Sequence, residues 1–340
     1  MFRRGVVLLG AIKKPKFEHS TNFQSSYEQL TGLEIKIPVP WGHIAGKWWG
    51  PTNIRPILTT HGWQDNCDSF NRLLPLISQD VGFLAVDWPG HGYSSHIPDG
   101  FYYHNTNYML LIQRLVDYFK WSQVSLMGHS LGASISFLYT IINPQNVDLL
   151  ICLENIKPLT EDIITTNSER IAKFLHYEKL RRQNTEPHAY TMEEIKRKIA
   201  SFLDGSVAYE HSHHLVERSV APSKSHPGKY CFTRDPRLKV LDLVNWRQKD
   251  LVLGARRVRC PVFIAKATGV SYFEEENNVH EVVDALKESG NCEHHLLEGT
   301  HHFHFNNPEA VAGLIKKFLK QRDRSDRSVG GIKEEMIVYS

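Results

Sequence analysis

The sequence predicts an α/β fold in which a mostly parallel sheet is covered by helices on both faces and interrupted by a helical block. Two observations lead to this prediction. Short, continuously apolar runs alternate with longer segments at helical spacing, as expected for strands that are buried on both faces. The alternation stops over 155–256, where the chain is polar, charged and largely helical without strong strand signals, and then resumes. Such a block is typical of an inserted cap.

The individual elements follow from these apolar periods. The apolar positions of 109–119, for example, recur at helical spacing, and Pro40-Trp41-Gly42 is a turn signal between two strand-like runs. The expected strands are 33–39, 43–49, 57–60, 83–86, 124–127, 149–153, 262–265 and 294–297, and the expected helices are 69–77, 109–119, 133–142, 279–287 and 308–319. The predicted core is therefore 31–154 and 257–321, with the cap at 155–256.

The two ends of the chain have a different composition. Residues 1–30 begin with a basic stretch that has no acidic residue before Glu18, as in a mitochondrial transit peptide, and a disordered basic tail is the alternative. Residues 322–340 are rich in charge and glycine and are expected to be disordered.

Composition excludes several classes of protein. A net charge of +3 without a basic stripe argues against nucleic-acid binding. The chain has five cysteines, an odd number, at wide spacings without a Cys-x-x-Cys pair, so neither a disulfide framework nor a zinc site is expected. The sequence contains no apolar run of about 18 residues or more, so no integral membrane segment is expected. We expect a cytoplasmic protein, with the mitochondrion as the alternative.

One motif carries the expected chemistry. Gly128-His129-Ser130-Leu131-Gly132 is a Gly-x-Ser-x-Gly pattern between an expected strand and an expected helix. In that context the serine occupies a sharp, strained turn that exposes its hydroxyl, and the helix N-terminus behind it stabilises negative charge. Ser130 is therefore the candidate nucleophile.

An oxyanion hole and a general base are expected on other loops. The strand 57–60 runs into His61-Gly62-Trp63, and the backbone N–H groups of Trp63 and Leu131 are the candidate oxyanion donors. Because the histidine comes last in this order of catalytic residues, His301 is the candidate base, ahead of His302 and His304 on the same loop.

At these residues the chain resembles the α/β-hydrolase superfamily, and within it the serine hydrolase-like (kraken-like) proteins. The resemblance covers roughly 33–319 and includes Pro40-Trp41-Gly42-His43, His61-Gly62-Trp63, Gly90-His91-Gly92, Gly128-His129-Ser130 and Arg234-Asp235-Pro236-Arg237-Leu238. It implies an eight-stranded α/β-hydrolase fold. It also supports His301, since the catalytic histidine of that superfamily commonly precedes a Pro-Glu pair, here Pro308-Glu309, by seven residues.

The acidic residue departs from the commonest pattern of the superfamily. The loop after 261–266, where many members place an aspartate, begins with seven residues that include no Asp or Glu. Some relatives place a glutamate at the end of the strand after the nucleophile helix, which is Glu154 here. A carboxylate that closes an apolar run is costly unless it is paired, and a histidine would supply the partner. Glu154 is the candidate acid and Glu274 the alternative.

These residues predict hydrolysis of a small carboxylic ester through an acyl-enzyme on Ser130, without metal or cofactor. The rival interpretations are a non-catalytic ligand-binding protein on the same fold, an acyl-thioesterase and a lipase. The sequence does not define the oligomeric state. The expected substrate-lining residues are His61, Phe70, Tyr93, His129 and Phe303.

Overall fold

The computed structural model describes residues 32–160, 163–183, 185–202, 205–240 and 242–321. The segments 1–30 and 322–340, predicted to be targeting or disordered sequence, lie outside these residues. No helix within the described ranges is long and apolar enough to cross a membrane.

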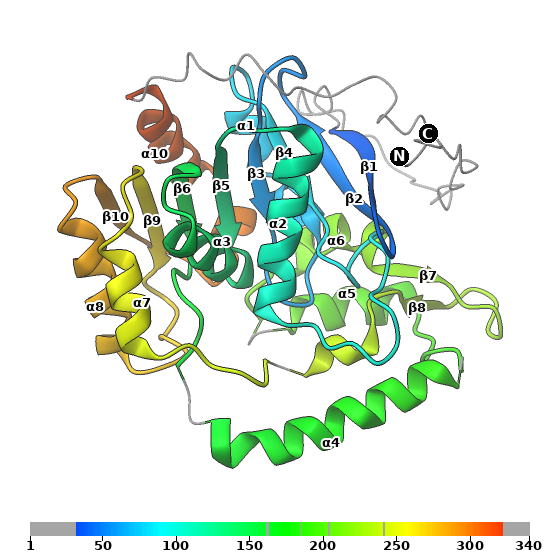
Figure 1. The fold of residues 1–340 in the computed structure, drawn as a ribbon. Coiled ribbons are helices and arrows are strands. Elements are labelled where there is room, and N and C mark those ends of the chain that lie inside the picture. Colours follow the sequence, from blue (N-terminus) through cyan, green and yellow to red (C-terminus); the bar gives the residue numbers. More distant parts are fainter. Residues whose placement is uncertain (1–31, 161–162, 184, 203–204, 241, 322–340) are drawn as a thin grey trace, which may run out of the picture.

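An eight-stranded sheet forms the centre of the molecule, with the spatial order β1-β2-β4-β3-β5-β6-β9-β10 (Figure 1). The strands β1 and β2 are antiparallel to their neighbours and form one edge, and the others run parallel. Their bounds are β1 Leu33–Val39, β2 Gly42–Trp49, β3 Ile57–Thr60, β4 Phe83–Val86, β5 Val124–His129, β6 Val147–Leu153, β9 Val262–Ala267 and β10 Cys292–Leu297. The predicted fold class is confirmed.

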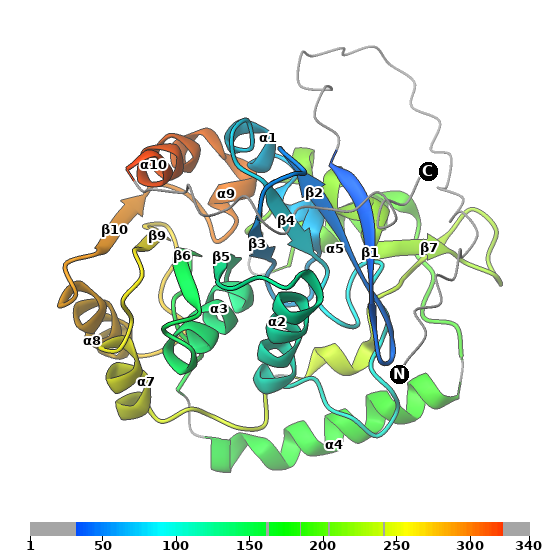
Figure 2. The ribbon, with the colours of Figure 1, turned by 45° about the horizontal axis from the view of Figure 1, so that its top comes forward.

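Helices cover both faces of this sheet (Figure 2). One face packs against α2 Asn105–Phe119, α3 Leu131–Ile142, α7 Gln248–Ala255 and α8 Glu276–Lys287, and the other against α1 Leu74–Ile77 and α10 Glu309–Lys320. The two hydrophobic clusters are separated by the sheet, because alternate strand residues point to opposite faces: Leu126 and Leu150 belong to one, and Met127 and Ile151 to the other.

The predicted helix 69–77 is wrong. The chain instead forms a 3₁₀ turn over Cys67–Phe70, capped by the Asn66 side chain, and then the short helix α1. Pro75 explains the break, because proline has no N–H to donate within a continuous helix and its ring clashes with the preceding turn.

Residues 155–247, which we call the insertion, lie between β6 and α7. They contain α4 Ile163–Arg182, α5 Met192–Ala200, α6 His213–Ser219 and a 3₁₀ turn at Pro236–Lys239. They also contain an antiparallel pair, β7 Val220–Pro222 and β8 Tyr230–Phe232, which corrects the expectation of a block without strands. Strands of three residues are too short to produce a recognisable alternation.

Helix α7 lies at the end of the range 155–256 that was predicted to be the cap. Leu251 and Ala255 of this helix are buried in the core cluster on the α3 face of the sheet, and α7 packs against α3 and α8. Helix α7 therefore belongs to the helices that cover the sheet. The chain returns to the core at about Gln248, rather than after residue 256 as predicted.

Candidate active site

Ser130 occupies the turn between β5 and α3. Its backbone has φ 51° and ψ −113°, a conformation that non-glycine residues rarely adopt. The flanking glycines are required by close backbone packing. A Cβ on Gly128 would lie 2.3 Å from the Ala133 nitrogen, and one on Gly132 would lie 2.2 Å from the Thr60 oxygen. The turn thus holds a partly exposed serine at the N-terminus of α3, where unpaired N–H groups favour negative charge.

Glu154 lies next to this turn because β5 and β6 are neighbours in the sheet. His129 pairs with Leu153, and the Ser130 N–H donates to the Leu153 carbonyl at 3.0 Å. Glu154 also has a positive φ of 71°. Three of the four non-glycine residues with positive φ in the described ranges, Gln64, Ser130 and Glu154, belong to the loops of this site. Such strain is commonly concentrated at functional sites.

The structure brings Glu154 and His301 together. His301 lies on the loop between β10 and the short helix α9 Phe303–Asn306, and its Nδ1 is 3.6 Å from Glu154 Oε1. This distance is an ion-pair separation rather than a hydrogen bond. Both ring nitrogens of His301 are buried without a hydrogen-bond partner among the described residues. Burial lowers the pKa of His301, whereas Glu154 raises it.

The alternative acid, Glu274, has different partners. Its carboxylate accepts hydrogen bonds from Lys157 Nζ at 2.6 and 2.7 Å and from Thr160 Oγ1 at 2.6 Å. Lys157 is fully buried, so Glu274 neutralises a cation that would otherwise be costly in the interior. Glu274 is therefore engaged away from His301.

Lys266 is a residue of this site that the sequence did not reveal. Its Nζ lies 2.7 Å from Glu154 Oε1, and the Ala267 N–H donates to Glu154 Oε2 at 2.9 Å. Both side chains are buried, and the Lys266 ammonium also donates to the carbonyls of Ala267 and Val270. Lys266 directly follows an expected strand, and only the pairing of β6 with β9 shows that it contacts the Glu154 carboxylate.

The two candidate oxyanion donors lie on segments next to Ser130. Leu131 is the first residue of α3, and Gly62, before Trp63, approaches the serine so closely that a Cβ on it would be 3.4 Å from Ser130 Cβ. The indole of Trp63 donates to the Leu238 carbonyl of the insertion at 2.7 Å. The loop that carries Trp63 is thus anchored to the insertion.

The five residues expected to line the substrate site are placed mainly in the core beneath it. His61, Phe70, His129 and Phe303 are buried. His61 bonds to the backbone of Trp88 and Gly62, and the Tyr93 hydroxyl donates to the Glu217 carbonyl. None of the five belongs to the wall of the cavity described next.

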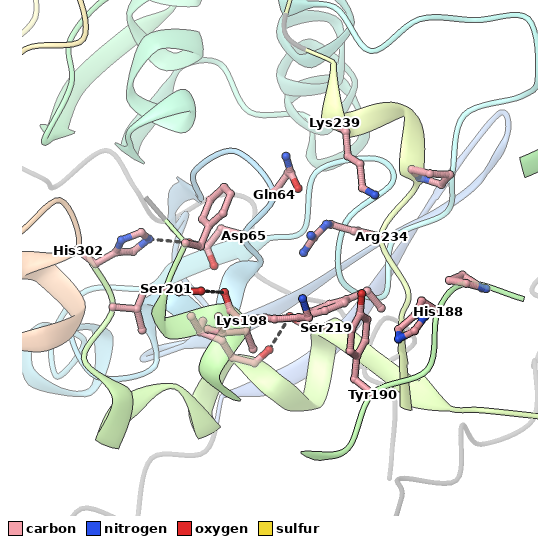
Figure 3. A pocket seen from close by; sticks show the side chains of 17 residues that line it. Gln64, Asp65, His188, Tyr190, Lys198, Ser201, Ser219, Arg234, Lys239 and His302 are labelled. Carbon is pink, nitrogen blue, oxygen red and sulfur yellow. Dashed lines mark hydrogen bonds and ion pairs between the residues drawn. The ribbon is translucent and has the colours of Figure 1, made fainter. Parts of the chain in front are cut away.

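A cavity of about 480 Å³ lies between the insertion and the loops of the site (Figure 3). Gln64 and Asp65 contribute from the loop after β3, and His302 from the loop after β10. Ser130 is not among its lining residues, but these three are sequence neighbours of Trp63 and His301. The rest of the wall comes from the insertion: Pro187, His188, Tyr190, Lys198, Ile199, Ser201, Phe202, Val207, Leu215, Ser219, Phe232, Arg234, Pro236 and Lys239.

Asp65, His129 and His302 could hold a metal ion, although the sequence predicted none. They offer one ligand atom each within 4.8 Å of one another. Asp65 Oδ2 and His129 Nδ1 are buried and have no hydrogen-bond partner within the described part of the chain, while His129 Nε2 faces the His301 carbonyl at 2.9 Å. That carbonyl would fix the imidazole in the tautomer that leaves Nδ1 free as a ligand. An ion pair between His302 and Asp65, whose atoms are 3.7 Å apart, accounts for two of the three residues without metal.

The fold and the residues of the candidate site define the class of protein to which this chain belongs. A family model described as alpha/beta hydrolase fold matches residues 55–247, and the chain belongs to this family. Its curated relatives narrow the assignment to serine hydrolase-like proteins, which confirms the resemblance seen in the motifs. A probable serine hydrolase of Drosophila melanogaster is 36% identical over 85% of this chain and 88% of its own length. A serine hydrolase-like protein of Danio rerio is 31% identical over 90% and 94%.

Solved structures agree on the architecture. A hypothetical protein from Pseudomonas aeruginosa PAO1 superposes with a TM-score of 0.72 at 26% identity, covering 85% of this chain and 98% of that one. The thioesterase domain from the curacin biosynthetic pathway has a TM-score of 0.68 at 20% identity, covering 84% and 99%. At that identity the second likeness supports the fold alone.

Proposed function

We propose that the chain is a serine hydrolase that cleaves a small ester through an acyl-enzyme on Ser130. The observation that carries the proposal is a strained serine at the N-terminus of α3 whose turn is hydrogen-bonded to the residue before Glu154, the partner of the buried His301. The insertion acts as the cap over this site, and its contact with Trp63 supports that role.

In the proposed mechanism, His301 removes the proton from Ser130 as the hydroxyl attacks the ester carbonyl. Glu154 orients the imidazole and stabilises its cationic form, and Lys266 holds the Glu154 carboxylate in place. The N–H groups of Trp63 and Leu131 stabilise the oxyanion. The protonated His301 then gives its proton to the departing alcohol, and a water molecule activated by the same histidine releases the acid.

The lowered pKa of His301 suits this role. Burial keeps the imidazole neutral at neutral pH, so the ring is available to accept a proton. Its unpartnered ring nitrogens are consistent with a free base, because catalytic hydrogen bonds are often long before substrate binds.

The test is labelling by a fluorophosphonate probe, which reacts with activated serines, together with turnover of p-nitrophenyl butyrate. Wild type is expected to be labelled and active, whereas Ser130→Ala loses labelling entirely and His301→Ala loses at least about 10³-fold in rate. Ser122→Ala, which alters an exposed serine between α2 and β5, is the matched control and should retain labelling. A folded wild type that resists the probe would instead favour the ligand-binding interpretation.

A further inference from the structure

The wall of the cavity between the insertion and the site loops carries more positive than negative side chains. Three cationic residues, Lys198, Arg234 and Lys239, line it, and Asp65 is the single carboxylate in its wall. Asp65 already faces His302 at 3.7 Å. Figure 3 shows Arg234 and Lys239 on one side of the cavity, with Asp65 and His302 on the other.

None of the three cations has an acidic partner among the described residues. Each instead lies over an aromatic ring: Lys198 Nζ is 4.5 Å from the Tyr190 ring centre, Arg234 Cζ is 4.6 Å from that of Phe232, and Lys239 Nζ is 5.0 Å from that of Tyr177. A ring face stabilises a cation by a few tenths to about 2 kcal/mol but does not neutralise it. The cavity therefore keeps uncompensated positive charge.

Arg234 is the most constrained of the three. Its Nε is buried and has no hydrogen-bond partner in the described part of the chain. Burial lowers the pKa of Arg234 to about 10, with Tyr190 acting in the opposite direction. The charges of Arg234 and Lys198 also contribute, after burial, to a lowered pKa of Lys239, which indicates that the cations are close enough to repel one another. A half-buried guanidinium with no acidic partner carries a desolvation cost that a bound anion would offset.

The neighbouring residues of the same sequence motif show the contrast. In Arg234-Asp235-Pro236-Arg237-Leu238, Arg237 and Asp235 form a fully buried pair at 2.8 Å, and Arg237 also donates to the carbonyls of Ile97, Pro98 and Phe101. Asp235 and Arg237 thus hold the insertion onto the core, whereas Arg234 is left free to face the cavity. The same motif ends at Leu238, whose carbonyl binds the Trp63 indole.

We propose that Lys198, Arg234 and Lys239 form an anion subsite, so that the substrate is an ester carrying a carboxylate or phosphate group. The inference rests on the proposed function, since it names the substrate class of the same site. The planar guanidinium of Arg234 would bind the anionic group with two parallel hydrogen bonds, and the two lysines would add charge. The aromatic wall formed by Tyr190, Phe202 and Phe232 would contact the apolar part of the substrate.

The experiment compares two esters of similar length, mono-p-nitrophenyl glutarate and p-nitrophenyl pentanoate. Wild type is expected to prefer the anionic ester about tenfold or more in kcat/KM, and Arg234→Gln to lower that preference about tenfold while changing the neutral ester little. Lys239→Gln, at a more exposed position, should lower the preference less. The matched control is Arg197→Gln on α5, which removes the same charge from a side chain that is 72% exposed and outside the cavity.

Binding without turnover separates this inference from the proposed function. Calorimetric titration of Ser130→Ala with glutarate and with inorganic phosphate should detect binding of at least one of these anions. The binding should be lost in the double variant that also carries Arg234→Gln. Comparison of the two titrations distinguishes a carboxylate ligand from a phosphate ligand. A wild type that turns over both esters without preference, together with no binding of either anion, overturns the subsite and leaves the hydrolase intact. Binding of an anion by a protein that the fluorophosphonate does not label supports the subsite and overturns the hydrolase.

Discussion

Glu154 and Glu274 lie at the carboxyl-terminal side of the same sheet, but their partners differ. Glu154 faces His301 and Lys266, whereas Glu274 neutralises Lys157. The first pair couples a carboxylate to the imidazole that gains and loses a proton in the proposed mechanism. The second is a buried ion pair, whose loss leaves an uncompensated charge. The two substitutions should therefore have separable effects.

We expect Glu154→Gln to lower kcat/KM for p-nitrophenyl butyrate by about 10²- to 10⁴-fold, because the neutral amide no longer stabilises protonated His301. The pH dependence gives a second readout. Burial lowers the pKa of His301 and Glu154 raises it, so removing the charge should move the acidic limb of the pH–kcat/KM profile further below pH 6.5. Stopped assays from pH 4.5 to 8 measure both effects.

Glu274→Gln is the comparison variant. It should reduce the free energy of unfolding by about 3–5 kcal/mol, since Lys157 loses its counter-charge, while the rate per folded molecule stays within about threefold of wild type. The reverse pattern, with activity lost at Glu274 and kept at Glu154, would transfer the acidic role to Glu274.

The sequence suggested some of these candidate residues and gave no sign of others, for physical reasons. Ser130 was recognisable because its flanking glycines and the strand–helix context reflect a local backbone requirement. Glu154 was recognisable because a carboxylate at the end of an apolar strand needs a partner. Lys266 and Arg234 had no such local signature, because the contacts of these side chains depend on which strands are neighbours and on how the insertion folds over the core.

At the scale of elements, the site depends on how closely β3, β5 and α3 approach one another. Gly132 of α3 lies against the backbone of Thr60 in β3, and Gly128 of β5 lies against the first turn of α3. These contacts leave no room for side chains and set the position at which the Ser130 hydroxyl emerges. Sequence periodicity located the three elements within a few residues, but it carried no information on this spacing.

Gly132→Ala tests the spacing. Its Cβ would lie 2.2 Å from the Thr60 oxygen, so we expect a loss of about 1–3 kcal/mol in unfolding free energy and a clear decrease in the rate of fluorophosphonate labelling as Ser130 is displaced. Urea unfolding and timed labelling provide the measurements.

Gly313→Ala is the matched substitution in α10. A Cβ there meets nothing within 4 Å, and alanine favours the helix, so this variant should gain about 0.5–1 kcal/mol and react with the probe at the wild-type rate. Equal behaviour of the two alanine variants would contradict the proposed role of the close approach.

At the scale of the whole molecule, many histidines are buried close to the site. His129 and His304 have ring centres 4.1 Å apart, and His61 and His91 have ring centres 5.0 Å apart. All four are fully buried, and burial is the main cause of their lowered pKa values. Neither periodicity nor composition predicted this, because these four histidines come from four separate segments that only the sheet and its loops bring together.

These histidines make the stability of the protein depend on pH. Each has a folded-state pKa below its unfolded value of about 6.5, so the unfolded chain binds more protons as the pH falls through 6.5. The contribution of each neutral ring to stability is therefore complete above pH 6.5 and is lost progressively below it, by up to about 1.4 kcal/mol per pH unit for each histidine. Acid should destabilise the protein well above the pH at which carboxylates titrate.

His304→Leu provides the test, because both ring nitrogens of His304 are buried without a hydrogen-bond partner among the residues that the structure describes, and the ring packs against Phe70. Urea unfolding at pH 7.5, 6.5 and 5.5 should show a decline in wild-type stability that becomes shallower in this variant by up to about 1.4 kcal/mol per pH unit. His280→Gln, on the exposed side of α8, removes a histidine outside this buried group and is the control variant. An unchanged decline in His304→Leu would mean that the ring is protonated inside the folded protein, and that the buried histidines are charged partners rather than neutral ones.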